Sequence, residues 1–371
     1  MFDLEASIFQ DGHWQGVRLS GSTHLETLTP TPVTSTRRLL PGCLDCHVHG
    51  GGGADIMSGE LALRKVLRAH ARLGVSGLVA TTVTGSDEAI DGVIAAVQAV
   101  MAAPESDAAR LLGVHLEGPY LAPDRLGAQP PETRDVDPAK VEAWFASGVV
   151  RIVTYAPEAD PHNQLPPLAA RYGVRLQLGH TNCAYAQAAL RLSEGHGVTH
   201  LYNAMSGVSH RGGGLALASL CHSEYAEIIC DGVHVEPSAV HLARKAIPKL
   251  YVVSDATAAA GMPDGTYQLG SHTVIKHGDS VRLSDGTLAG SAATAGRMVT
   301  LVREWGFGWQ EIIDRFSNYP AHWLGLEAQF GCIRPGARAD FLELDGERPV
   351  ATWVAGRRIP HLSEDPDSST N

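Results

Sequence analysis

Six side chains that commonly bind metal ions are found at the ends of short apolar runs in this sequence. They are His47, His49, Glu117, His180, His200 and Asp255. Imidazole and carboxylate groups together suit Zn2+ and similar first-row divalent ions. His47 and His49 are separated by one residue, so a strand would project both imidazoles to the same side. The sequence predicts a metal site, although a hydrogen-bonded core position is the alternative for any one histidine taken alone.

The two carboxylates have neighbours that suit an active site. Glu117 precedes a Gly-Pro pair, which would hold it at the end of its strand, and the Pro- and Gly-rich segment 121–134 has the composition of a lid. Asp255 precedes the small residues 256–261, which leave room for a ligand. Metal-assisted hydrolysis needs a carboxylate that takes a proton from the attacking water and passes it to the leaving group. We expect Asp255 in that role; a surface acid and a helix cap are the alternatives for Glu117 and Asp255.

These residues can meet only if a regular set of strands brings them together. Amphipathic segments such as 60–73 and 139–146 separate the apolar runs, as βα units require. Eight such units predict a TIM-type (β/α)8 barrel, whose active sites lie where the C-terminal strand ends converge. The eight runs are 43–48, 77–82, 111–116, 150–155, 175–178, 198–201, 226–230 and 250–254.

Both ends of the chain contain alternating, strand-like segments, including 341–344 and 352–355. Chain termini often lie close together, so the two ends can pair in one unit. We therefore predict an α/β protein with a barrel over residues 43–329 and a small β-sandwich domain formed by residues 1–42 and 330–371. Residues 279–287 add a hairpin-like segment after the eighth barrel strand.

Composition narrows the class of protein. The chain has 371 residues, 44% of them hydrophobic, and a net charge of −11, which disfavours nucleic acid but still permits a small anionic metabolite in a cleft. We find neither a signal peptide nor a run of about 18 apolar residues, so we expect a cytoplasmic protein without membrane contact.

The six cysteines are expected to be free thiols. Cys43 and Cys46 form a C-x-x-C, for which we favour a structural role over half a zinc site or a redox pair.

Longer blocks of the sequence are similar to a known family. The chain resembles the N-acetylglucosamine-6-phosphate deacetylases of the amidohydrolase superfamily over nearly its whole length. The most specific blocks are Thr199-His-Leu-Tyr-Asn-Ala-Met-Ser and Ser254-Asp-Ala-Thr-Ala-Ala-Ala-Gly. The others lie at 41–53, 115–120, 178–182, 231–234, 262–265, 288–291 and 334–340.

The resemblance implies a role for individual residues. Glu117, His180 and His200 would hold the principal metal ion, and Asp255 would be the acid/base and a ligand of a second ion. Because it keeps His47 and His49, the chain resembles the family members that can bind two ions. We expect the metal to be Zn2+, with Mn2+, Co2+ or Fe2+ as alternatives. Substrate would be held by Asn203, Ala204 and His234, and by Arg211 from a neighbouring subunit, which implies a homodimer; a solvated loop charge is the alternative for Arg211.

The resemblance also implies a reaction, the hydrolysis of N-acetyl-D-glucosamine 6-phosphate to D-glucosamine 6-phosphate and acetate in amino-sugar catabolism. Alternatives are an N-acetylgalactosamine-6-phosphate deacetylase, another N-acyl amidohydrolase, or a non-catalytic barrel that binds a sugar phosphate. One position departs from the family, which usually carries Gly-Ala-His where this chain has Gly127-Ala-Gln129. The Gln129 amide can donate a hydrogen bond to the substrate carbonyl, but it cannot supply positive charge or titrate near neutrality. The alternative is that Gln129 faces solvent.

Overall fold

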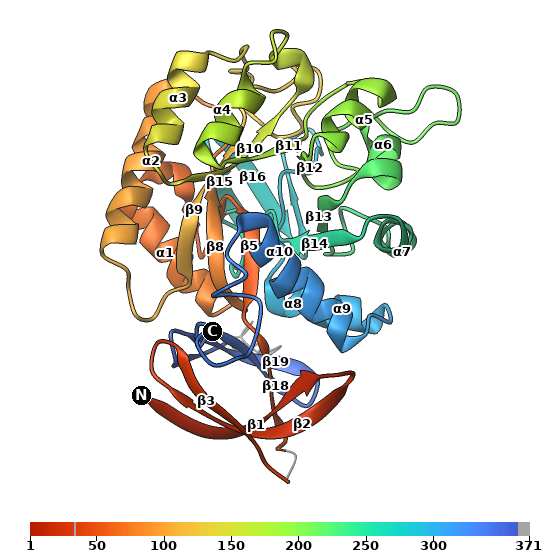
Figure 1. Cartoon of the computed structure of the whole chain (residues 1–371). Coiled ribbons are helices and arrows are strands. Elements are labelled where there is room, and N and C mark those ends of the chain that lie inside the picture. Colours follow the sequence, from red (N-terminus) through yellow and green to blue (C-terminus); the bar gives the residue numbers. More distant parts are fainter. Residues whose placement is uncertain (33–34, 363–371) are drawn as a thin grey trace.

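A computed structural model describes residues 1–32 and 35–362, and its centre is a barrel of eight strands (Figure 1). The ladders that join neighbouring strands of the barrel are parallel. The strands are β5 (Cys43–Val48), β8 (Val75–Thr81), β9 (Arg110–Glu117), β10 (Val150–Tyr155), β11 (Arg175–Leu178), β12 (Gly197–Val198), β13 (Tyr225–Ile229) and β14 (Lys249–Val253).

Two contacts close the barrel where the regular ladders are interrupted. The Leu201 N–H donates to Glu227 O at 2.8 Å, and the Asp255 N–H donates to His47 O at 3.0 Å. Every residue of β5 and of β8 is buried, which explains why these strands are continuous apolar runs in the sequence. The predicted barrel is therefore confirmed.

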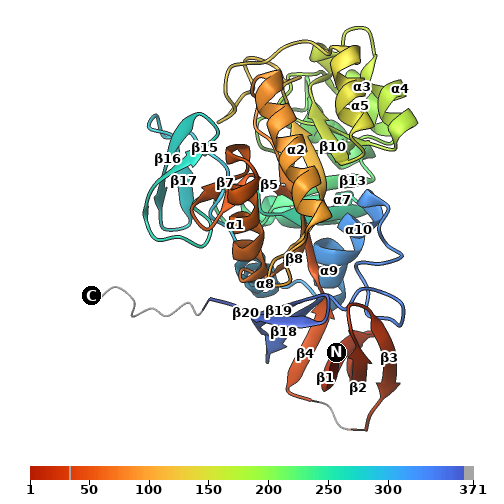
Figure 2. The same ribbon diagram turned by 90° about the vertical axis from the view of Figure 1, so that its left-hand side faces the viewer.

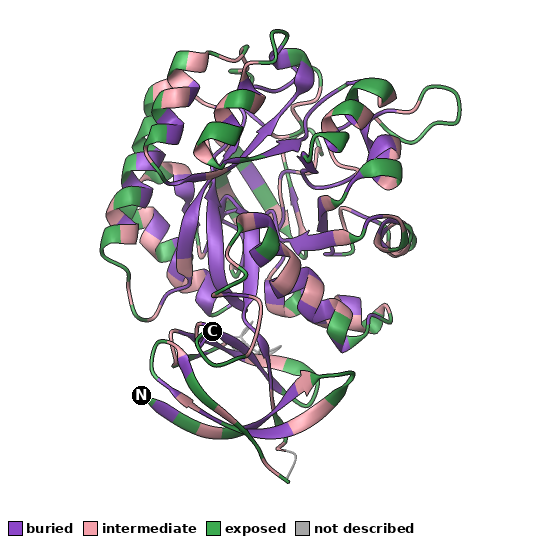
Figure 3. Ribbon diagram, viewed as in Figure 1, coloured by how far each residue is buried: buried purple, intermediate pink, exposed green. Residues whose placement is uncertain are grey.

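Helices surround the barrel, with buried residues toward it and exposed residues outward (Figure 3). The predicted segments 60–73 and 139–146 correspond to α1 (Glu60–Ala71) and α3 (Pro138–Ala146), and the Asp137 side chain caps α3 by accepting from two backbone N–H groups. The other α-helices are α2 (Asp87–Ala102), α4 (Leu165–Tyr172), α5 (Tyr185–Ser193), α6 (Leu215–His222), α7 (Pro237–Ala246), α8 (Ala295–Glu304), α9 (Trp309–Ile313) and α10 (Tyr319–Leu324). Short turns η1 (Ile56–Ser58) and η2 (Pro157–Ala159) and the π-helical η3 (Asp314–Asn318) complete the set.

No helix within residues 1–32 and 35–362 has the length and apolar character needed to cross a membrane.

Both chain ends contribute to one mixed sheet beside the barrel, in the order β20-β19-β18-β4-β1-β2-β3 (Figure 1). This sheet curls around its own core, so that Phe2 of β1 contacts Phe341 of β18 with ring centroids 6.2 Å apart. The predicted β unit built from both ends is confirmed, and its strands belong to one continuous sheet. They are β1 (Phe2–Gln10), β2 (His13–Gly21), β3 (Leu25–Pro30), β4 (Arg37–Pro41), β18 (Phe341–Asp345), β19 (Arg348–Val354) and β20 (Arg357–Pro360).

A third, antiparallel sheet follows the eighth barrel strand and lies to one side of the barrel, near β7 (Ala54–Asp55) (Figure 2). It contains β15 (Gly265–Leu269), β16 (His272–His277) and β17 (Ser280–Arg282), so the predicted hairpin residues 279–287 form only its last part. The Gly270 N–H donates to Asp55 Oδ2 at 2.7 Å, which ties this sheet to the short ribbon of β6 (Gly50–Gly51) and β7 (Ala54–Asp55). The sheet thereby places residues 287–290 beside the barrel mouth.

Candidate metal centre

All six metal-competent side chains meet at the C-terminal ends of the barrel strands, and all are buried. His47 lies in β5, with His49 just beyond that strand, and Glu117 is the last residue of β9. His180, His200 and Asp255 each follow closely on a strand, namely β11, β12 and β14. Residues far apart in the sequence are thus brought together by the strand ends, as the barrel predicts.

The first group of donors consists of Glu117, His180 and His200. Glu117 Oε1 lies 3.0 Å from His180 Nε2 and 2.9 Å from His200 Nε2, and the two imidazole nitrogens are 3.1 Å apart. Donor atoms bound at roughly 2.0–2.1 Å to a tetrahedral Zn2+ would be about 3.3 Å from one another. The observed spacing therefore fits a divalent ion held by these three residues.

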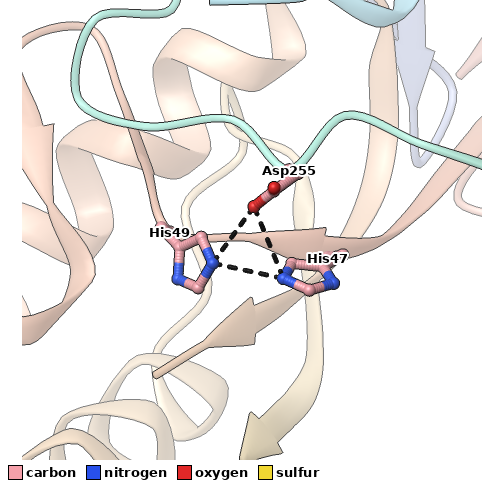
Figure 4. Close-up of side chains that lie close together, drawn as sticks. All are labelled: His47, His49 and Asp255. Carbon is pink, nitrogen blue, oxygen red and sulfur yellow. Dashed lines mark hydrogen bonds and ion pairs between the residues drawn. The ribbon is translucent and has the colours of Figure 1, made fainter. Parts of the chain in front are cut away.

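The second group consists of His47, His49 and Asp255, whose side chains point toward one another (Figure 4). His49 Nε2 lies 3.2 Å from His47 Nε2 and 3.2 Å from Asp255 Oδ1, and His47 Nε2 lies 3.5 Å from the same oxygen. Glu117 joins the two groups, because its Oε2 lies 3.2 Å from His49 Nε2. A single carboxylate therefore has one oxygen for each group, and the arrangement can hold one or two ions.

The electrostatic field at the site favours a cation. Burial lowers the pKa of His47, but the charges of Glu117, Asp255 and Glu227 outweigh burial and raise that pKa well above its usual value. The pKa of His49 is raised to about 9, since contacts with Asp255 and Glu117 outweigh burial there too. In the described part of the chain these three carboxylates form ion pairs with histidines and with no Lys or Arg. A divalent ion would supply the missing positive charge.

The backbone is strained where it presents these ligands. His180, His200 and Asp255 have φ values of 48°, 28° and 51°, in a region that non-glycine residues seldom occupy. Such strain is kept only where the surrounding structure enforces it, and it gathers at functional sites. Here it turns three buried side chains from the strand ends into the barrel mouth.

The predicted lid residues contact the metal-competent groups directly. The His180 Nδ1–H donates to Arg125 O at 2.8 Å, and the Ala122 N–H donates to His180 O at 2.9 Å. The Gln129 side chain is buried, with its carbonyl oxygen 2.7 Å from the Thr84 N–H and its amide N–H donating to Glu117 Oε2. Gln129 therefore lies at the centre and does not face solvent.

A pocket of about 220 Å³ opens onto the two groups. The predicted substrate residues Gln129, Asn203, Ala204 and His234 all line it. The Asn203 amide donates to His200 O at 3.2 Å, and His234 Nδ1 lies 2.7 Å from Asp231 Oδ2. That contact and the charges of Asp231 and Asp255 outweigh burial and raise the pKa of His234, so a proton is favoured on this imidazole.

Three other residues that the sequence analysis singled out, namely Arg211, Cys43 and Cys46, lie elsewhere. Arg211 is exposed, in the segment between Ser206 and α6 that extends beside α5 and α6 in Figure 1, and it does not line the pocket of its own chain. Cys43 and Cys46 are buried unpaired thiols within β5, and burial raises the pKa of Cys43 to about 12. Neither cysteine belongs to a cluster of metal-competent groups in residues 1–32 and 35–362.

Several residues of the site received no role from the sequence. Leu269, Thr287 and Gly290 line the pocket, although Gly290 belongs to a block, 288–291, that the resemblance had singled out. Glu227 is fully buried and contacts His47 Nδ1 at 3.0 Å. Glu227 could not be singled out from the sequence, because one acid inside an apolar strand run does not reveal which strand it faces across the barrel.

The sequence pattern that describes the amidohydrolase family matches residues 38–367. The chain belongs to the amidohydrolase family. This amidohydrolase is 35% identical over 341 residues to N-acetylglucosamine-6-phosphate deacetylase of Bacillus subtilis (strain 168), an alignment that covers 89% of the chain and 86% of the relative. It is also 35% identical over 346 residues to N-acetylgalactosamine-6-phosphate deacetylase of Escherichia coli O157:H7, covering 90% and 92% of the two chains.

A solved structure of a relative supports the same comparison. The amidohydrolase superposes with a TM-score of 0.86 on a variant of N-acetyl-D-glucosamine-6-phosphate deacetylase from Mycobacterium smegmatis in complex with N-acetyl-D-glucosamine-6-phosphate. The two are 29% identical, and the match covers 95% of this chain and 98% of the other.

Proposed function

We propose that this amidohydrolase hydrolyses the acetamide of N-acetyl-D-glucosamine 6-phosphate, giving D-glucosamine 6-phosphate and acetate. The observation that carries the proposal is the placement of Asp255 within the buried donor groups that Glu117 joins, at the floor of a pocket. The relatives extend this chemistry to a substrate, since the Bacillus subtilis enzyme carries that activity in its name and the Mycobacterium smegmatis enzyme was solved with the sugar phosphate.

Glu117, His180 and His200 would hold the principal ion, with Zn2+ our first choice, and His47, His49 and Asp255 would hold a second. A divalent ion at this position supplies a Lewis acid for the amide carbonyl and lowers the pKa of water. Asp255 is suited to take a proton from the attacking water, because His47 and His49 outweigh burial and lower its pKa to about 2, so that it is ionised at neutral pH. It can then deliver the proton to the amine that leaves.

The polar residues of the pocket would orient the substrate. The Gln129 amide has two N–H groups, one of which donates to Glu117, so the second remains for the substrate carbonyl. His234, held by Asp231 through Nδ1, has Nε2 left for a phosphate or hydroxyl oxygen. We propose that Arg211 serves the pocket of a neighbouring subunit in a homodimer, since it is exposed and lies outside its own. The cytoplasmic location stays a prediction.

The galactosamine epimer is the second candidate, since the Escherichia coli relative named for it is 35% identical. Acetate release from a panel of N-acetyl compounds, supplied to the Zn2+-loaded protein, tests the proposal. The panel should contain both hexosamine epimers, each with and without 6-phosphate, and an N-acetyl amino acid. We expect the largest kcat/KM with N-acetyl-D-glucosamine 6-phosphate. Release of no acetate from any phosphorylated sugar would reject the function, and preference for the other epimer would reject the substrate.

A further inference from the structure

A buried carboxylate lies in the barrel interior, in contact with both groups of donors. Glu227 belongs to β13, and its side chain has no solvent exposure. Its Oε2 lies 3.0 Å from His47 Nδ1 and accepts from the His200 N–H at 3.3 Å. We propose that Glu227 is a positioning residue that prepares one ligand of each group for metal binding. This inference rests on the proposed function of the site.

The contact with His47 determines which imidazole nitrogen carries hydrogen. A carboxylate accepts and cannot donate, so Nδ1 keeps its hydrogen, and Nε2, which is directed toward His49 and Asp255, is the nitrogen that would give up its proton to bind a metal ion. His47 Nε2 lies 3.2 Å from His49 Nε2 and 3.5 Å from Asp255 Oδ1. Carboxylates that hold a ligating histidine in this way fix its orientation and strengthen it as a ligand.

The contact with His200 acts on the backbone. His200 has φ of 28°, and its N–H is satisfied by the same Glu227 oxygen that accepts from His47. This bond holds the strained residue in the conformation that directs its Nε2 to Glu117 Oε1, 2.9 Å away. One oxygen atom therefore links a ligand of the first group with a ligand of the second.

A further cation site is the rival interpretation, because Glu227, His47 and His115 form another cluster of metal-competent groups. Both ring nitrogens of His115 are already engaged, Nδ1 with Cys46 O at 3.0 Å and Nε2 with Thr154 Oγ1 at 2.6 Å. His115 therefore has no nitrogen to give to a cation. The other oxygen of Glu227, Oε1, accepts from the Tyr251 hydroxyl at 3.3 Å. The contacts of Glu227 therefore fit a residue that positions His47 and His200 better than a ligand of a further cation.

Three variants separate this role from others. Glu227→Gln keeps the shape of the side chain and removes its charge, and Glu227→Asp keeps the charge on a shorter side chain. Tyr251→Phe is the control: it removes a hydroxyl that contacts Glu227 Oε1 at 3.3 Å and Gln177 Oε1 at 2.8 Å, and it leaves both contacts of Glu227 Oε2 in place. Metal-stripped protein would be titrated with Zn2+ against a chromogenic chelator, and ions per chain would be counted by mass spectrometry. We expect Glu227→Gln to weaken Zn2+ binding about 10- to 100-fold, most for the weaker-bound ion, with partial recovery in Glu227→Asp. Tyr251→Phe should bind Zn2+ nearly as the wild type does.

A purely structural role predicts a different result, namely a lower melting temperature with unchanged Zn2+ affinity. Unchanged affinity in both folded Glu227 variants would overturn the proposal. If Glu227→Gln does not fold, 15N-histidine NMR of the Zn2+-loaded wild type decides, since we expect His47 as the Nδ1–H tautomer and the Nε2–H tautomer would overturn it. Wild-type acetate release tests the proposed function separately, because it does not depend on the outcome for Glu227.

Discussion

Glu117 and Asp255 have different contacts and therefore different expected roles. Glu117 Oε1 contacts His180 and His200, and its Oε2 contacts His49, so Glu117 belongs to both groups of donors. The Asp255 carboxylate forms its ion pairs with His47 and His49 of the second group, and Asp255 lines the pocket. A change at Glu117 should therefore disturb metal binding as a whole, whereas a change at Asp255 should separate chemistry from binding of the principal ion.

We predict that Asp255→Asn lowers kcat about 100- to 10,000-fold, because an amide cannot accept the proton that a carboxylate accepts. The principal ion should remain, since Glu117, His180 and His200 are unchanged. Steady-state kinetics and the zinc content of the purified variant measure the two effects. Near-native turnover in this variant would show that another residue is the base.

Gln129 lies where the resemblance led us to expect a histidine, and its side chain is buried beside Glu117. We predict that Gln129→Ala lowers kcat about 100- to 1000-fold with a smaller change in KM, as loss of one donor to a developing oxyanion does. Gln129→His should add a titration near pH 6 to 7, because an imidazole changes charge there. A silent Gln129→Ala together with an unchanged pH profile in Gln129→His would remove Gln129 from the reaction.

At the scale of elements, the loop after β17 supports the strand end that presents Asp255. Gly290 has φ of 56°, and a Cβ there would lie 2.8 Å from Asp255 O and 2.6 Å from Thr257 Cγ2. Gly286 in the same loop has φ of 91°, but a Cβ there would meet nothing within 4 Å. Replacing each glycine by alanine therefore compares two effects. Both variants place a side chain on a left-handed backbone, but only the one at Gly290 also brings a Cβ against the strand end that presents Asp255.

We predict that Gly286→Ala and Gly290→Ala each lose about 1–2 kcal/mol of unfolding free energy from backbone strain, and that Gly290→Ala loses more. Only Gly290→Ala should also lower kcat, by roughly tenfold or more, since a small displacement of a reacting group is costly. Urea unfolding and kinetics on both variants provide the measurement. Equal losses of kcat in the two variants would contradict a direct effect on Asp255.

The sequence predicted the barrel elements well because their strands are buried on both faces and read as apolar runs. Their ends were less predictable: the run 198–201 was longer than β12 (Gly197–Val198), because His200 leaves the strand in a left-handed conformation. β15 and β16 were missed, since their many exposed polar side chains give little hydrophobic signal. The contacts of Glu227 were not predictable, because they depend on how strands distant in the sequence face one another across the barrel.

At the scale of the whole molecule, the sheet built from both ends is joined tightly to the base of the barrel. β4 continues into β5 through Gly42, whose N–H donates to Asp340 O at 3.0 Å, and the Ser317 hydroxyl donates to Pro41 O at 3.1 Å. The chain therefore enters the barrel from a fixed direction. The domain limits at residues 42 and 330 stay a prediction.

Assembly of two chains can be tested through Arg211. We predict that Arg211→Ala raises KM for the phosphorylated sugar about 10- to 150-fold, the equivalent of a charge-assisted hydrogen bond of roughly 1.5–3 kcal/mol, with little change for the unphosphorylated sugar. Mixing this variant with Asp255→Asn should recover activity if Arg211 serves the neighbouring pocket, because one site of the hybrid dimer is then complete. Mixtures without recovery would place Arg211 in its own chain's site or outside any site.

The most direct test of the whole account is metal titration of the stripped protein, with acetate release from N-acetyl-D-glucosamine 6-phosphate and ions bound per chain measured on the same samples. We predict no turnover without metal, and a rise in proportion to Zn2+ bound that ends at one or two ions per chain, because the two groups of donors joined by Glu117 can hold one or two ions. Protein shown to be free of metal that still releases acetate at the full rate would contradict the account.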